Sequence, residues 1–159
     1  MSLSWLRLLW GSWLKPNKLL WRYKDYMVRC LVVDDDELGR ELIAQYLEDV
    51  AVCDMAENGF QAVEMFRAAF EGGEPYDLMI LDIVMPEMDG YTAAKEIRTI
   101  EKEWGVSIND GLSIIVLSSL NTPGDVIQAY VSAKSAAHLV KPVQPDKLRG
   151  AINKLGICG

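Results

Sequence analysis

The sequence contains little cysteine and only one histidine among its 159 residues. Its three cysteines, Cys30, Cys53 and Cys158, are odd in number and lack the spacing of a metal site. Cys30 and Cys53 fall in apolar, strand-like segments, which predicts buried, reduced thiols in a cytoplasmic protein. The apolar segment 3–14 is shorter than a bilayer-spanning helix, and it lacks the charged lead and small-residue cleavage site of a secretory signal.

Positive charge is also scarce outside the N-terminal segment. The whole chain has a net charge of −7, which argues against direct binding to nucleic acid. Residues 1–26 carry five basic side chains and one acid, a net charge of +4, so the remaining residues carry −11. Half of the residues are hydrophobic, and the length fits one globular domain with room for a proper core.

The first 26 residues differ in composition from the rest of the chain. They hold four of the five tryptophans, Trp5, Trp10, Trp13 and Trp21, and Pro16 ends any helix formed before it. Three interpretations remain open. The segment is non-native sequence upstream of a natural start at Met27, a cationic interfacial anchor, or a helix that packs on the domain or on a partner. We therefore divide the chain into an N-terminal extension, 1–26, and one domain, 27–159.

From Met27 onward, short apolar segments alternate with segments of helical periodicity. The predicted strands are 28–33, 51–56, 78–81, 114–117 and 138–140, and the predicted helices begin near residues 36, 59, 90, 123 and 145. Alternating strands and helices with apolar strands indicate an α/β fold whose parallel sheet is covered on both faces. We expect the following helical side chains to face the core: Leu38, Leu42, Ile43, Tyr46, Leu47, Phe60, Val63, Phe66, Phe70, Ala93, Ala94, Ile97, Ile100, Val126, Ile127, Tyr130, Leu148 and Ile152.

Polar side chains mark the points at which four of these strands end. Asp34 and Asp35 follow the first strand, Asp82 the third, Ser118 the fourth and Lys141 the fifth. The carboxyl ends of parallel strands share one edge of the sheet, where open α/β sheets bind their ligands. Crowded carboxylates repel one another unless a cation is bound, and Mg²⁺ prefers oxygen ligands. A carboxylate nucleophile beside Mg²⁺, a lysine and a hydroxyl is what an aspartyl-phosphate site requires.

The order of these motifs resembles the receiver domain of two-component response regulators. The matching segments are 32–35 (VVDD), 81–82 (LD), 85–90 (MPEMDG), Ser118 and 141–142 (KP). The resemblance implies a flavodoxin-like, three-layer sandwich whose five-stranded parallel sheet has the order 2-1-3-4-5. It also implies that Lys141-Pro142 is a cis peptide bond.

The resemblance further implies roles for the residues at the strand ends. Asp82 would accept a phosphoryl group from a sensor histidine kinase or a phosphotransfer protein. The metal ligands for Mg²⁺ would be Asp34, Asp35, Asp82 and the backbone carbonyl of Val84. Lys141 would contact the phosphoryl group, and Ser118 would move to hydrogen-bond it.

Some positions depart from the family pattern. His138 stands where the family has an aromatic switch residue, and it is either a swinging switch or a partly exposed strand residue. The usual glycine after the fourth helix is missing near Ala133 and Lys134. Val84 and Leu120 occupy two positions that tune hydrolysis in the family, and neither side chain can orient water. We therefore predict a slowly hydrolysing phosphoaspartate.

Three functions remain as hypotheses. The first is a phosphorylation-driven switch. Such a protein assists its own phosphorylation and dephosphorylation but is not an enzyme. It would signal to a protein partner through the surface formed by the fourth helix, the fifth strand and the fifth helix. We expect no binding to nucleic acid, and contact with a membrane only if residues 1–26 are native. It could equally be a receiver fragment of a hybrid kinase. The second is a phosphorylation-independent adaptor. The third is a phosphatase of the haloacid dehalogenase type, which Val84 disfavours because those enzymes place an acid there.

Overall fold

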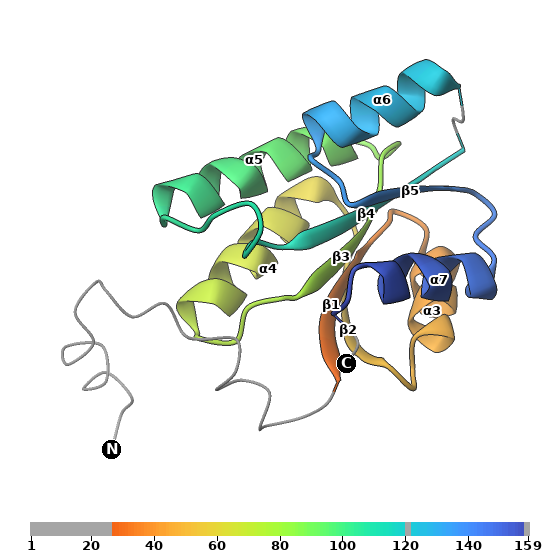
Figure 1. The fold of residues 1–159 in the computed structure, drawn as a ribbon, viewed down its shortest axis with the longest axis horizontal. Helices are drawn as coiled ribbons and strands as arrows, with labels where there is room; N and C mark the ends of the chain where they lie inside the picture. The colour runs from red at the N-terminus through yellow and green to blue at the C-terminus, as the bar shows by residue number, and fades with distance from the viewer. Residues whose placement is uncertain (1–26, 120–121, 158–159) are drawn as a thin grey trace.

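The computed structural model describes residues 27–119 and 122–157. Five strands alternate with five helices within these ranges (Figure 1). The strands are β1 (Val28–Val33), β2 (Ala51–Ala56), β3 (Leu78–Asp82), β4 (Ser113–Ser118) and β5 (Ala137–Val140). The helices are α3 (Glu37–Tyr46), α4 (Gly59–Glu71), α5 (Gly90–Glu103), α6 (Pro123–Ser132) and α7 (Pro145–Lys154). The interpretations offered for the tryptophan-rich segment 1–26 concern residues outside these ranges.

The strands form one parallel sheet in the order β2-β1-β3-β4-β5, which confirms the predicted flavodoxin-like topology. The register aligns Val33 with Leu81, so the residues that follow them, Asp34 and Asp82, lie at the same level of the sheet. Ser118 is paired with Val140, immediately before Lys141. The topology therefore brings the polar strand ends to one edge.

Helices cover both faces of the sheet and make it the middle of three layers. Helices α4, α5 and α6 lie on one face, and α3 and α7 lie on the other (Figure 1). Alternate residues of each strand point into different cores, because successive side chains in a strand face opposite sides. Leu31 and Val33 thus pack under α4 and α5, whereas Cys30 and Val32 pack under α3 and α7.

Several helical side chains expected in the core are exposed. Leu38 on α3 is 73% exposed, and Leu42 and Phe60 are also exposed. On α6, Ile127 is 62% exposed and Tyr130 is exposed, so the helix buries only Ala129 among its side chains. The helical periodicity located the helices correctly, but it overestimated the width of the face that the sheet covers. Most of the expected set is buried as predicted: Ile43, Leu47, Val63, Phe66, Ala93, Ala94, Ile97, Ile100, Leu148 and Ile152.

The thiols agree only in part with the prediction. Cys30 is fully buried and free, but Cys53 is free and only half-buried, because β2 is an edge strand. Cys158 lies outside the described residues. Within the described ranges, no helix has the length and apolar character needed to cross a bilayer.

Candidate functional site

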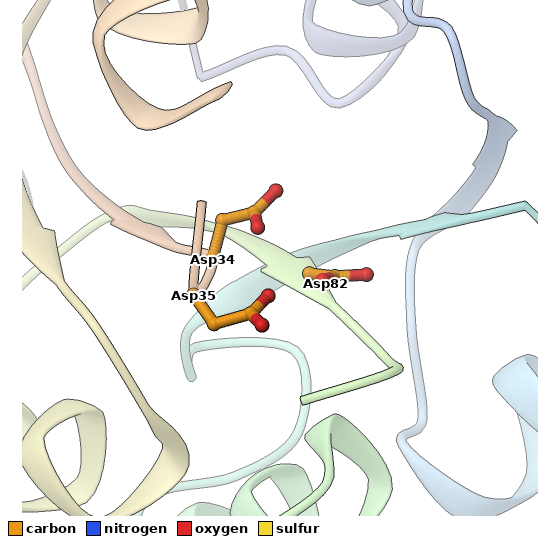
Figure 2. A group of neighbouring side chains, drawn as sticks. All are labelled: Asp34, Asp35 and Asp82. Carbon is orange, nitrogen blue, oxygen red and sulfur yellow. The ribbon is translucent and has the colours of Figure 1, made fainter. Parts of the chain in front are cut away.

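Three carboxylates meet at the carboxyl ends of β1 and β3. Asp34 and Asp82 are each only 4% exposed, whereas Asp35 is exposed. One carboxylate oxygen from each of Asp34, Asp35 and Asp82 lies within 4.8 Å of the other two (Figure 2). The site therefore joins two buried acids to one that is open to solvent.

Lys141 follows β5 and extends its ammonium group toward the same carboxylates. Its Nζ atom lies 2.8 Å from Oδ2 of Asp34 and 3.4 Å from Oδ2 of Asp82. Its backbone N–H donates to the carbonyl of Ser118 at 2.9 Å, and its peptide bond to Pro142 is cis, as expected. Lys141 thus contacts two buried acids, of which Asp34 lies 107 positions earlier along the chain.

Burial and charge perturb the ionisation of this cluster. Burial, together with the charge of Asp34, raises the pKa of Asp82 to about 6, although Lys141 opposes the shift. Partial burial lowers the pKa of Lys141, but its hydrogen bond to Asp34 and the charge of Asp82 outweigh this effect and raise it. Three carboxyl groups therefore lie beside one ammonium group, so the cluster holds more acidic than basic side chains.

The donor set fits a small, hard cation. Carboxylate oxygens are the ligands that Mg²⁺ prefers, and the excess negative charge favours a divalent ion. Asp34, Asp35 and Asp82 would hold it. Val84 directly follows Ile83, its backbone N–H interacts with the carboxylate of Asp82, and its side chain is 60% exposed. The predicted contribution of the Val84 carbonyl stays a prediction.

The remaining predicted residues lie around the same edge. Ser118 is 1% exposed at the end of β4, next to the strand that carries Asp82. His138 lies on β5, half-buried, and its buried Nε2 atom has no hydrogen-bond partner among the described residues. Its partial burial agrees with either interpretation of its role, so the switch function stays a prediction. Leu120, the second position expected to affect hydrolysis, lies outside the described residues.

Two further residues, Asp36 and Arg40, contact Asp34. Asp36 precedes α3, but its side chain makes no capping hydrogen bond; instead its backbone N–H donates to Oδ1 of Asp34 at 3.0 Å. Arg40 is buried and donates from Nη1 to the backbone carbonyl of Asp34 at 2.7 Å. Both bonds fix the position of Asp34. The position of Arg40, one turn into a helix, gave no sign of this role.

The start of α5 packs directly against the backbone of Asp82. Gly90 donates its N–H to the carbonyl of Ile83 at 3.0 Å, and a Cβ atom at Gly90 would lie 2.3 Å from the carbonyl oxygen of Asp82. Asp89 caps the helix by accepting from the N–H of Thr92 at 2.8 Å. Asp89 and Gly90 therefore have the structural role that their turn chemistry predicts.

The sequence profile of the response regulator receiver domain matches residues 30–153. The chain belongs to this family. The chemotaxis protein CheY of Bacillus subtilis is 38% identical over 128 residues, which cover 79% of this chain and 95% of that protein. Histidine protein kinase 1 of Candida albicans is 27% identical over 139 residues, or 84% of this chain, but the chain spans only 5% of that kinase. Receiver domains similar to this one thus occur both in small proteins and in much longer kinases.

Solved receiver domains share the fold. One match is a chain of the Saccharomyces cerevisiae co-crystal structure of the histidine phosphotransfer signaling protein Ypd1 with the receiver domain of Ssk1. It has a TM-score of 0.70 and 26% identity, covering 82% of this chain and 89% of that chain. Another match is the receiver domain of the histidine kinase CKI1 from Arabidopsis thaliana, complexed with Mg²⁺ and BeF₃⁻. It has a TM-score of 0.68 and 29% identity, covering 81% of this chain and 89% of that chain.

Proposed function

We propose that this receiver domain accepts a phosphoryl group on Asp82 in a Mg²⁺-dependent reaction, and that the phosphorylated form signals to a protein partner. The observation that supports this most directly is the position of Asp82. Its buried carboxylate lies 3.4 Å from Nζ of Lys141. It is also close enough to the carboxylates of Asp34 and Asp35, within 4.8 Å, for all three to bind one metal ion. The resemblance to receiver domains assigns the role of nucleophile to Asp82, and Asp34 and Asp35 would hold the cation together with it.

The chemistry transfers one phosphoryl group from a histidine to an aspartate. An oxygen of the Asp82 carboxylate attacks phosphorus, and the bond between phosphorus and the donor's imidazole nitrogen breaks. The bonding electrons leave with the imidazole, which takes up a proton. Lys141 balances charge on the phosphoryl oxygens, and the Ser118 hydroxyl donates a hydrogen bond to one of them after moving toward it. Mg²⁺, when bound, supplies further neutralisation of the phosphoryl charge.

The donor and the output are proteins. A sensor histidine kinase or a histidine phosphotransfer protein supplies the phosphoryl group, in keeping with the Ypd1 complex of the yeast receiver domain and with the resemblance to receiver domains of histidine kinases. The chain is a phosphoacceptor that assists its own phosphorylation and dephosphorylation, rather than an enzyme with a separate substrate. We place it in the cytoplasm, a reducing compartment that suits a chain with the free thiols Cys30 and Cys53.

Intact mass after incubation with acetyl phosphate and Mg²⁺ tests the proposal. We expect one phosphoryl adduct on the wild-type chain, and none after chelation of Mg²⁺ or in Asp82→Ala. Asp146→Ala, which removes an exposed acid from the first turn of α7, is the matched control and should keep the adduct. An adduct that survives in Asp82→Ala contradicts the assignment of Asp82. No adduct on a folded, Mg²⁺-binding wild-type chain favours the adaptor hypothesis instead.

The same experiment followed over time measures the lifetime of the phosphoaspartate. Val84 exposes an apolar side chain two residues after Asp82 and cannot orient an attacking water. The adduct should therefore persist for much longer than seconds after acetyl phosphate is removed. A half-life of seconds contradicts this prediction without affecting the assignment of the acceptor.

A further inference from the structure

Two cysteines lie directly opposite each other on neighbouring strands. The parallel pairing of β1 with β2 aligns Cys30 with Cys53. Both side chains point to the face of the sheet that α3 and α7 cover, and both belong to the same apolar core. Neither residue takes part in the site formed by Asp34, Asp82 and Lys141. The pair therefore needs an explanation of its own.

The spacing of the two strands brings these thiols within bonding reach. Neighbouring strands lie about 4.8 Å apart, and disulfides join residues whose Cα atoms are roughly 4.4–6.8 Å apart. The side chains project from the same side of the sheet, and an interaction between the two thiols is a leading cause of the perturbed ionisation of both. The spacing of paired strands therefore falls within the range of Cα separations that a disulfide spans.

The two thiols differ in exposure and in acidity. Cys30 has no exposed surface, whereas Cys53 lies on the edge strand and is half-buried. The hydrogen bond with Cys53, burial and the charge of the neighbouring thiol raise the pKa of Cys30. The hydrogen bond from Cys30 lowers the pKa of Cys53, although partial burial opposes this effect. Because the thiolate is the nucleophile, Cys53 is the thiol that an oxidant would reach and Cys30 the one held beside it.

We propose that Cys30 and Cys53 form a reversible redox site, in which hydroperoxides oxidise the pair to a disulfide that joins β1 to β2. The sulfur of Cys53 attacks one peroxide oxygen, the O–O bond breaks, and Cys53 becomes a sulfenic acid while water or an alcohol leaves. The sulfur of Cys30 then attacks the sulfur of Cys53, expelling its hydroxyl group as water with the proton of Cys30. The two thiols lose two electrons, and the peroxide gains them. A dithiol reductant reverses the reaction by thiol–disulfide exchange.

The test uses the full chain with Cys158→Ser, which removes the third thiol. The folded protein is incubated with hydrogen peroxide, its free thiols are blocked by alkylation, and it is digested with trypsin without reduction. Cleavage after Arg29, Arg40 and Arg67 places Cys30 and Cys53 in different peptides, 30–40 and 41–67. We expect the intact mass to fall by two hydrogen atoms and the two peptides to be linked, and dithiothreitol should restore both changes.

Single-cysteine variants assign the two roles. In Cys30→Ala, Cys53 should accumulate as a sulfenic acid that dimedone traps, because the second thiol is missing. In Cys53→Ala, the buried Cys30 should remain a free thiol at the same peroxide concentration. The proposal is overturned if the folded chain keeps both thiols, if Cys53 passes directly to sulfinic acid, or if oxidation gives only dimers linked between chains. None of these readouts depends on Mg²⁺ or on phosphorylation of Asp82.

Discussion

Two groups of buried charge in this domain differ in how well their charges are matched. On α5, Nη1 of Arg98 lies 2.7 Å from Oε2 of Glu101, so one guanidinium faces one carboxylate. The other oxygen of Glu101 accepts the N–H of Leu112 at 2.6 Å, and Arg98 also donates to the carbonyl of Lys134 at 3.1 Å. This pair joins α5 to the residue before β4 and to the turn after α6, and its two charges balance.

The cluster at the strand ends is organised differently. Asp34, Asp35 and Asp82 lie close together, and Lys141 contacts Asp34 and Asp82. The pKa of Asp82 is raised to about 6 by its burial and by the charge of Asp34. A group that contributes only to stability has little reason to leave like charges unmatched, since desolvated charges without partners are costly. Charge balance thus separates a structural ion pair from a site that is built to receive a ligand.

The largest effect expected is the loss of the balanced pair. Glu101→Ala leaves Arg98 buried without its carboxylate and the N–H of Leu112 without an acceptor, so it should lower the free energy of unfolding by about 3–5 kcal/mol. Urea denaturation measures the change. Glu96→Ala, an exposed glutamate on the same helix, is the control and should stay within about 0.5 kcal/mol of wild type. A loss below about 1 kcal/mol for Glu101→Ala would contradict the structural role.

Removing charge from the unbalanced cluster should have the opposite sign. The pKa of Asp82 is about 6 in the folded chain, against 3.8 for an unperturbed aspartate. The stabilisation from its protonated form is therefore fully present below about pH 4 and is lost as the pH rises through 6. Asp82→Asn should raise the free energy of unfolding at pH 7, without divalent cations, by roughly 1–2 kcal/mol.

Denaturation of Asp82→Asn and wild type across pH 4–8 measures this difference. The gain should shrink toward zero at the acidic end of the range. Asp146→Asn, at an exposed position, serves as the control and should show no such pH-dependent gain. A difference between Asp82→Asn and wild type that is the same at pH 4 and pH 7 would mean that burial of the Asp82 charge is not its cause.

Mg²⁺ should stabilise the unbalanced cluster and leave the balanced pair unaffected. At ten times its dissociation constant, a ligand that binds only the folded state adds about 1.4 kcal/mol. Thermal unfolding with increasing Mg²⁺ should show this rise in wild type and in Glu101→Gln. It should be absent from the double variant Asp34→Asn/Asp82→Asn. An equal shift of the melting temperature in the double variant would place the ion elsewhere.

The smallest effect concerns the turn that receives the hydrogen bond from Arg98. Lys134 has a φ of 46°, in the left-handed region that disfavours side chains, at the point where the sequence lacked the usual glycine. Lys134→Gly should add about 0.5–1 kcal/mol, because it relieves this strain while its carbonyl still accepts from Arg98. Lys134→Ala is the control and should bring no gain. Comparative thermal unfolding of both variants decides whether the strain is real.

The sequence was most informative where chemistry and topology coincide. The strands that end in a polar residue could be located because each is an apolar segment followed directly by that residue. In a parallel sheet these ends share one edge, so Asp34, Asp82 and Lys141 had to lie close together. Arg98 and Glu101 could not be identified in this way, because their burial depends on Leu112 and Lys134, which no local pattern links to them. The exposure of Leu38 and Ile127 was equally unpredictable, since periodicity does not report how much of a helix its neighbours cover.

Helix α6 is held in the fold by few of its own side chains. It buries only Ala129, while its ends are fixed by the Thr122–Asp125 capping box and by backbone bonds around Ala133. Ile127, Tyr130 and Val131, which lie between these ends, are exposed. Substitutions on this outer face should therefore cost little folding stability, so homologous chains can acquire new binding preferences there while the acidic site at the sheet edge stays unchanged.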